Sequence, residues 1–109
     1  MGFDLNAQDP GHFGWTPLIG SIYFEFTNIS SYLIGKTNVD VCIRDGTGQT
    51  ALRLAIICND INTGRLLVDT RRAELAKGED WRMVRSTVAA MEDKEQEAWI
   101  VILNGLIEP

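Results

Sequence analysis

Histidine and cysteine are scarce in this chain of 109 residues: His12 is the only histidine, and Cys42 and Cys58 are the only cysteines. The sequence has no Cys-x-x-Cys, no His-x-x-x-His and no glycine-rich phosphate loop. Zinc sites and nucleophilic catalysis need such side chains at such spacings. We therefore expect no catalytic residue, no metal and no cofactor. An enzyme or metal-binding protein that uses these three residues is the remote alternative, and core packing is the preferred explanation of both cysteines.

Concentrated positive charge is also missing. Ten Lys and Arg residues face fifteen Asp and Glu residues, which gives a net charge of −5. In the one local enrichment, Glu74, Glu79 and Asp80 are interleaved with the basic side chains Arg71, Arg72, Lys77, Arg82 and Arg85. Such a mixture is typical of a solvated helix edge. We expect no direct contact with nucleic acid, which requires a basic face, and an acidic surface favours a basic protein partner.

Long hydrophobic runs are absent as well. Runs such as residues 98–103 are far shorter than the roughly 20 apolar residues that cross a bilayer. Asp4 stands near the start, where a secretory signal carries basic residues. We expect a cytoplasmic protein that does not enter a membrane and whose cysteines stay reduced, without a disulfide.

The sequence instead contains a motif that occurs twice. Leu5-Asn6-Ala7-Gln8-Asp9 is followed, after four residues, by Gly14-Trp15-Thr16-Pro17-Leu18. Val41-Cys42-Ile43-Arg44-Asp45 is followed, after two residues, by Gly48-Gln49-Thr50-Ala51-Leu52. Gly48 lies 34 residues after Gly14, a period within the range of about 20 to 50 residues that is typical of stacked repeats. Such arrays bury their core between neighbouring units.

Each copy predicts a pair of helices. Thr16 and Thr50 stand where a helix N-cap is needed, and Pro17 takes the first helical position, where its missing N–H costs nothing. A polar break and a second helical segment follow in each copy, after Asn28 in the first and Asp60 in the second. Residues 38–45 alternate β-branched with polar or small residues and predict an extended, hairpin-like connection between the units.

These residues resemble the ankyrin repeat. Gly14-Trp15-Thr16-Pro17-Leu18 and Gly48-Gln49-Thr50-Ala51-Leu52 are similar to its Gly-x-Thr-Pro-Leu helix start, and residues 5–9 and 38–45 resemble its inter-unit joint. The resemblance implies an all-α solenoid of helix-turn-helix units joined by short hairpin-like loops. We call the loop before each helix start a finger: residues 9–15 form the first and residues 45–49 the second.

The departures from the repeat pattern are informative. Ile19 and Arg53 replace the usual histidine, so its hydrogen-bond network is absent or rebuilt. Glu25 and Asn59 replace the inter-helix glycine; because only Asn tolerates positive φ well, we expect a non-standard turn near Glu25. Two extra residues between Asp9 and Gly14 imply a longer first finger.

The last part of the chain is the least regular. Residues 73–75 resemble another joint, but no Gly-x-Thr-Pro-Leu follows them. Trp81, Val84, Val88 and Met91 recur at helical spacing, and residues 98–106 form a second apolar segment. We predict a divergent C-terminal capping helix pair and one ankyrin-like domain over residues 1–109, with units at about 3–37, 38–71 and 72–109.

The resemblance implies a concave binding face made of finger tips and the outer positions of each first helix. The partner-binding residues that it implies are His12, Phe13, Trp15, Tyr23, Phe24, Arg44, Thr47, Gln49, Ile57, Trp81 and Arg82. The same mapping includes Gln8, Gly46, Cys58, Glu79 and Asp80. The first-unit residues are strongly aromatic, as interface anchors often are. Alternatively, these rings close the open N-terminal end of the array.

We therefore expect a protein-protein interaction module, not an enzyme. About three units favour one dedicated partner, which would be inhibited or masked, as by an immunity protein or a phage inhibitor. The expected partner is another protein, a basic one, and the expected state is a monomer or weak oligomer. The alternative is a general adaptor or scaffold without an inhibitory role.

Overall fold

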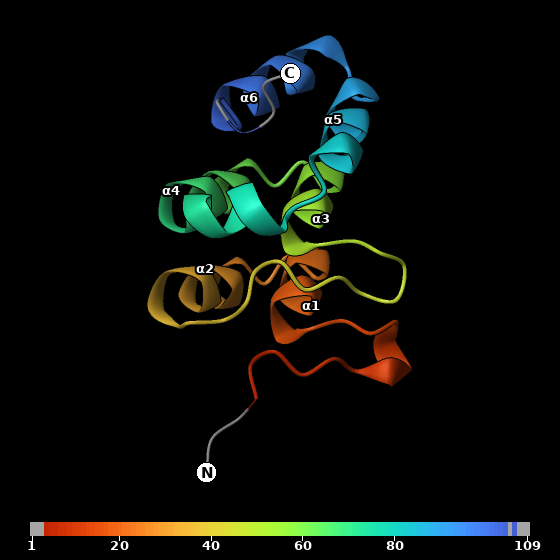
Figure 1. Ribbon diagram of the computed structural model, residues 1–109, viewed down its shortest axis with the longest axis vertical. Coiled ribbons are helices and arrows are strands. Elements are labelled where there is room, and N and C mark those ends of the chain that lie inside the picture. Colours follow the sequence, from red (N-terminus) through yellow and green to blue (C-terminus); the bar gives the residue numbers. More distant parts are fainter. Residues whose placement is uncertain (1–3, 105, 107–109) are drawn as a thin grey trace.

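The computed structural model describes residues 4–104 and Leu106. This described part contains helices and turns but no β-strand (Figure 1). The helices are a short 3-10 helix η1 (Pro10–His12) and the α-helices α1 (Pro17–Tyr23), α2 (Thr27–Lys36), α3 (Ala51–Ile57), α4 (Ile61–Gly78), α5 (Trp81–Ala89) and α6 (Asp93–Ile102). None of them is long and apolar enough to cross a membrane.

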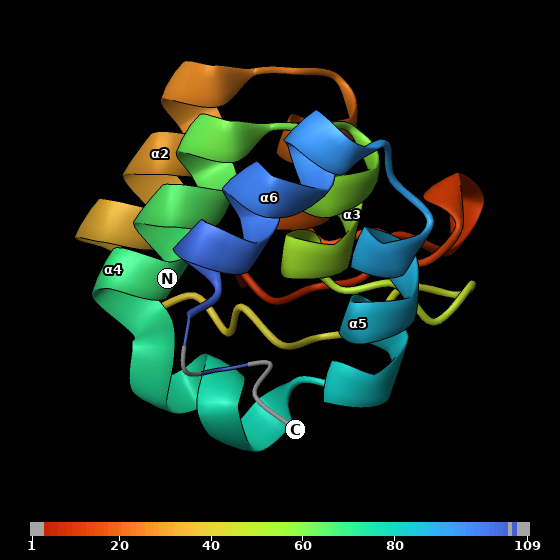
Figure 2. The ribbon, with the colours of Figure 1, turned by 90° about the horizontal axis from the view of Figure 1, so that it is seen from above.

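The α-helices form three stacked pairs. Each first helix contacts its own second helix, α1 with α2, α3 with α4 and α5 with α6. Between pairs, first helices contact first helices and second helices contact second helices, so two rows run along the stack (Figures 1 and 2). The molecule measures 45 × 26 × 24 Å. The predicted all-α solenoid is confirmed.

The helices begin where the sequence predicts. The hydroxyl of Thr16 accepts a hydrogen bond from the backbone N–H of Ile19, and that of Thr50 accepts one from Arg53. Asp60 caps α4 and Asp80 caps α5 in the same way. These side chains satisfy backbone donors that have no partner inside a helix, so the helix starts are fixed by local chemistry.

The turn between the paired helices is the same in the first two units. Glu25 has a φ of 60° and Asn59 a φ of 52°. The backbone N–H of Glu25 donates to Ile22 and that of Asn59 donates to Ile56, at 3.1 and 3.0 Å. The expectation of a non-standard turn at Glu25 is therefore wrong. The stack imposes the left-handed conformation on Glu25, although its Cβ makes that conformation costly.

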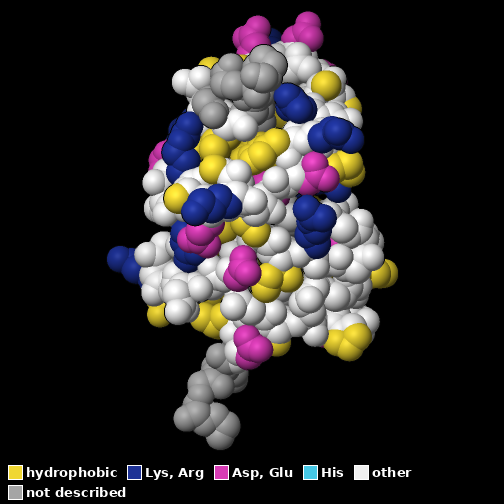
Figure 3. Space-filling view, viewed as in Figure 1, with side chains coloured by type: hydrophobic (Ala, Val, Ile, Leu, Met, Phe, Trp, Pro, Cys, Tyr) yellow, Lys and Arg dark blue, Asp and Glu magenta, His cyan; other side chains and the backbone are white. Residues whose placement is uncertain are grey.

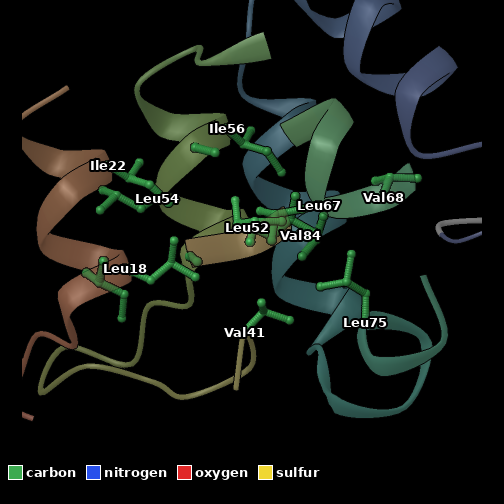
Figure 4. Packing of buried hydrophobic residues seen from close by; sticks show 14 of the residues in the cluster. Leu18, Ile22, Val41, Leu52, Leu54, Ile56, Leu67, Val68, Leu75 and Val84 are labelled. Carbon is green, nitrogen blue, oxygen red and sulfur yellow. The ribbon is translucent and has the colours of Figure 1, made fainter. Parts of the chain in front are cut away.

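The core lies between the two rows of helices. Leu52, Leu67 and Val84 converge there from α3, α4 and α5 (Figure 4). Val39 and Val41, from the connection between the first two units, are also buried. That connection contains turns and no strand; the only isolated β-bridge among the described residues joins Asp9 and Trp15 in the first finger. Burial of each large aliphatic side chain contributes about 1.5 to 3 kcal/mol.

The third unit departs from the expected pattern. The joint expected at residues 73–75 is wrong, because α4 continues as a helix to Gly78 with one non-helical residue, Arg71, at φ −128°. The guanidinium of Arg71 donates to the backbone oxygens of Ile34, Thr37 and Val39. α4 is thereby tied to the preceding joint. Glu79 and Asp80 then lead directly into α5, without a third finger.

The C-terminal helix pair covers the second unit through Trp99. This side chain is fully buried, and its indole N–H donates to the side-chain oxygen of Asn59 at 3.0 Å. Gly64 makes room for the ring, because a Cβ at this position would lie 2.2 Å from Cζ3 of Trp99. A predicted capping helix pair is therefore present. The unit boundaries themselves stay a prediction.

Candidate protein-binding groove

Backbone and amide contacts hold the two fingers side by side. The N–H of Gly46 donates to the carbonyl of Phe13 at 2.7 Å, and the side-chain amide of Gln8 donates to the carbonyls of Gly14 and Arg44. Gly14 has a φ of 74°, which favours glycine, and a Cβ on it would lie 3.0 Å from the nitrogen of Gly46. Both the backbone conformation and the close approach of the second finger therefore favour glycine at this position. The two fingers therefore form one wall.

The extra residues of the first finger form a helical turn. η1 (Pro10–His12) projects from the loop, and Phe13 follows it in the left-handed conformation, at φ 58°. Asp9 closes the loop, since it exchanges backbone hydrogen bonds with Gly14 and Trp15 at 2.8 and 2.9 Å. The longer first finger that the sequence predicts is confirmed, and it carries Phe13 to the surface.

A groove of about 320 Å³ lies between the finger wall and the first helices of the first two units. Its lining is mainly apolar and aromatic, and it consists of Phe13, Trp15, Tyr23, Asp45, Thr47, Gln49, Leu54 and Ile57. Phe13 is 65% exposed and Tyr23 is 52% exposed. Rings that are this exposed are available for contact with a partner.

Trp15 is the centre of an aromatic cluster. Its ring centroid lies 4.7 Å from that of Tyr23 and 5.8 Å from those of Phe13 and Phe24. His12 stacks on Trp15 at 6.2 Å. Half-buried Trp15 thus supports the exposed rings. Because each ring is held by its neighbours, little side-chain entropy remains to be lost on binding.

The structure brings most of the predicted site residues together. Phe13, Trp15, Tyr23, Thr47, Gln49 and Ile57 line the groove. His12 and Phe24 share a neighbouring hollow of about 300 Å³ with Trp15, and Arg44 lines a third hollow of about 190 Å³ with Thr47. Trp81 and Arg82 lie outside the groove at the start of α5, where Trp81 packs against the core.

Sequence reasoning missed two residues of the groove. Leu54 and Asp45 line the groove but are not among the partner-binding residues predicted from the sequence. Leu54 is 6% exposed and has a small counterpart, Gly20, 34 residues earlier. This change from glycine to leucine is the sequence signal that the second unit builds the floor of the groove. Asp45 has no comparable signal, because an Asp is expected in this turn for local reasons.

Asp45 fixes the second finger. Its carboxylate accepts hydrogen bonds from the N–H and the hydroxyl of Thr47 and from the N–H of Gln49, at 2.7 to 2.9 Å. Burial by itself raises the pKa of Asp45, but these hydrogen bonds outweigh it and hold the pKa below its ordinary value. The groove wall therefore carries a negative charge at neutral pH.

Neither cysteine has a lowered pKa, and Cys58 is exposed, so the expectation that core packing explains both cysteines is wrong for Cys58. Burial raises the pKa of Cys42 to about 11, and burial also raises the pKa of Cys58. Both thiols are thus protonated at neutral pH, when a nucleophile or metal ligand would need the thiolate. His12 instead bonds the exposed carboxylate of Asp9 at 2.6 Å. Among the residues that the structure describes, no three His, Cys, Asp or Glu side chains form a metal-binding group.

Comparison with known families agrees with the stacked helix pairs. The family model for ankyrin repeats, with three copies, matches residues 1–77. The chain therefore belongs to the ankyrin repeat family. No curated protein and no solved structure matches it. Ankyrin repeats are protein-binding modules and are not typically enzymes, and this chain is accordingly a protein-protein interaction module.

Proposed function

We propose that the chain binds one basic protein in the groove between its fingers and first helices, and that it inhibits or masks that protein. The observation that carries this proposal is the pair of exposed rings, Phe13 and Tyr23, held over an apolar floor. Aromatic side chains at the centre of a contact each contribute a few kcal/mol to binding. A groove of this size accommodates a short segment or a few side chains of the partner.

The charge distribution favours a basic partner. The chain has a net charge of −5, and the ionised carboxylate of Asp45 lies in the groove wall. Opposite charges speed the encounter of two proteins, and the effect weakens as salt screens them. The free thiols of Cys42 and Cys58 fit the cytoplasmic location that we propose together with this function.

The first experiment is co-purification of the partner from the native host. The wild-type chain and the variants Phe13→Ala, Trp15→Ala and Tyr23→Ala serve as baits, and Val101→Ala is the control. Val101 is 72% exposed on α6, away from the groove. We expect wild type and control to retain one abundant protein with a basic isoelectric point. The groove variants are expected to lose it while they keep the helical circular dichroism of the wild type.

The kinetics of the complex separate inhibition from adaptor function. A dedicated inhibitor is expected to show one tight partner, whose association slows at least tenfold when salt rises from about 50 to 500 mM. Several weak partners with little salt dependence would instead indicate a general adaptor. Equal retention of the partner by the wild type and by all three groove variants would show that the groove is not the binding site.

A further inference from the structure

The outer side of the first helix pair is apolar and exposed. We call this surface the N-terminal end face; it is the lower side of α1 and α2 in Figure 1, where the chain that precedes α1 runs beneath part of α1. Its residues are Pro17, Gly20 and Phe24, which border one hollow, Phe26 and Ile29, which border another, and the exposed Tyr32 of α2. Tyr32 is 61% exposed, and Phe24, Phe26 and Ile29 are 51 to 55% exposed. A patch of large apolar side chains on one face marks an interaction surface.

The repeat itself shows what kind of contact this face can make. Counted 34 residues on, Pro17 and Gly20 correspond to Ala51 and Leu54, which are buried on α3. Ile29 corresponds in the same way to Thr63, which is buried on α4. In the second unit these positions are covered because α3 and α4 stack on α1 and α2. The end face is thus a helix-stacking surface that has kept large apolar residues.

The face has two unlike halves. On the α1 side, Ala7, Pro17, Gly20 and Phe24 border a hollow of about 300 Å³. On the α2 side, Ile29 and Tyr32 present exposed side chains. A two-fold contact would set the α2 half of one copy against the α1 half of the other. Such an isologous contact uses the same patch twice and closes on itself.

Charge favours a second copy of the chain as the occupant. Between Pro10 and Gly35 the only Asp, Glu, Lys or Arg is Glu25, and Asp9, which borders the hollow on the α1 side, is paired with His12 at 2.6 Å, although the whole chain has a net charge of −5. Two acidic molecules can therefore approach through this face with little repulsion. The opposite end carries Asp and Glu side chains, seen at the top of Figure 3, and is a poor match for an apolar surface. We propose that the chain forms a head-to-head dimer through the N-terminal end face.

The size of the face sets the strength of the dimer. The stack is 26 × 24 Å in cross-section. Complete coverage of such an end removes about 600 Å² per copy, or about 1,200 Å² in total, which is at the lower limit for a specific interface. We therefore expect a dissociation constant in the micromolar range and a concentration-dependent mixture of monomer and dimer.

The test is sedimentation velocity of the full chain at about 1 to 300 µM, for wild type and for exposed-residue variants. Ile29→Glu and Tyr32→Glu place two like charges in the contact, and each is expected to raise the dissociation constant at least tenfold. Tyr32→Phe and Val101→Glu are the controls, and both are expected to dimerise like the wild type. Circular dichroism of each variant checks that the helices remain.

Three outcomes would overturn the proposal. A chain that is monomeric over the whole concentration range does not dimerise, and a different protein would then be the partner of the end face. A dimer that persists in both glutamate variants uses another surface. Loss of association with Val101→Glu as well as with Tyr32→Glu would indicate a head-to-tail contact. Phe13→Ala distinguishes a test of the dimer from a test of the groove. This variant is expected to lose binding of the partner protein and to dimerise like the wild type.

Discussion

Single residues in this molecule are held in conformations and environments that they do not prefer. Glu25 has the φ of 60° that suits glycine, and Glu79 is a buried carboxyl whose Oε1 accepts a hydrogen bond from Thr50. Both are tolerated because the rest of the stack fixes the backbone around them. Their costs are local, so each can be measured by one substitution.

Replacement of Glu25 by glycine is expected to stabilise the protein. A side chain at positive φ costs about 1 to 2 kcal/mol, and glycine escapes this cost but gains freedom in the unfolded chain. We expect Glu25→Gly to raise the free energy of unfolding in urea by about 1 kcal/mol. Glu25→Ala, which loses the carboxylate but keeps the Cβ, is the control and should gain nothing. An equal gain in both variants would show that charge, not backbone strain, is responsible.

Glu79 is expected to make the stability depend on pH. Burial raises its pKa from an ordinary value of 4.5 to about 7, against the opposing hydrogen bond from Thr50. Between these pH values the folded state binds more protons than the unfolded state, so this group lowers the stability as pH rises from about 4.5 to about 7. Glu79→Gln is expected to reduce that loss by up to about 3 kcal/mol and to be the more stable protein at pH 8.

Unfolding curves at pH 5 and pH 8 measure this effect. The quantity compared is the difference between variant and wild type at each pH, because this difference cancels the pH dependence of the groups that the two proteins share. Parallel pH dependences of the two proteins would contradict the assignment to Glu79.

Among the elements, the helix pairs were predictable from sequence because their signals are local. Thr16 and Thr50 cap the helices that follow them, and a threonine, a proline and a period of 34 residues suffice to find those starts. The end of α4 was not predictable. Its course depends on Arg71, whose guanidinium donates to carbonyls 32 to 37 residues away, and no local pattern records such contacts.

The docking of α6 depends on one glycine of α4. Gly64→Ala would place a Cβ 2.2 Å from the Trp99 ring, which must then move out of the core. We expect a loss of about 1 to 3 kcal/mol in unfolding free energy and faster hydrogen exchange in α6 than in α1 or α2. Gly35→Ala is the matched control, since nothing lies within 4 Å of the added Cβ and alanine favours the helix. Slow exchange in α6 of Gly64→Ala would show that the ring tolerates the methyl group.

At the scale of the whole molecule, the sequence predicted the part of the candidate site that lies between the first two units. It did not predict the arrangement of the C-terminal helix pair. Phe13, Trp15 and Tyr23 come together with residues of the second unit because both fingers are present and stack. The resemblance implies the same face for Trp81 and Arg82, but the chain forms no third finger there: Glu79 and Asp80 lead directly into α5. The groove therefore belongs to the first two units.

Two surfaces of the first unit have different proposed functions: one binds the partner protein and the other forms the dimer. The groove carries Phe13 and Tyr23, and the N-terminal end face carries Ile29 and Tyr32. Phe24 lies beside Tyr23 and Phe26, at 5.2 and 5.8 Å, and links the two aromatic surfaces. Variants in Phe13 and in Tyr32 are therefore the ones that separate partner binding from self-association.

The most direct measurement is the affinity of the co-purified partner for wild type, Phe13→Ala, Tyr23→Ala and Val101→Ala, by titration calorimetry at one salt concentration. If the groove is the binding site, Phe13→Ala and Tyr23→Ala each raise the dissociation constant by about thirtyfold, equivalent to about 2 kcal/mol, and Val101→Ala leaves it unchanged. Dissociation constants of both groove variants within threefold of the wild-type value would contradict it.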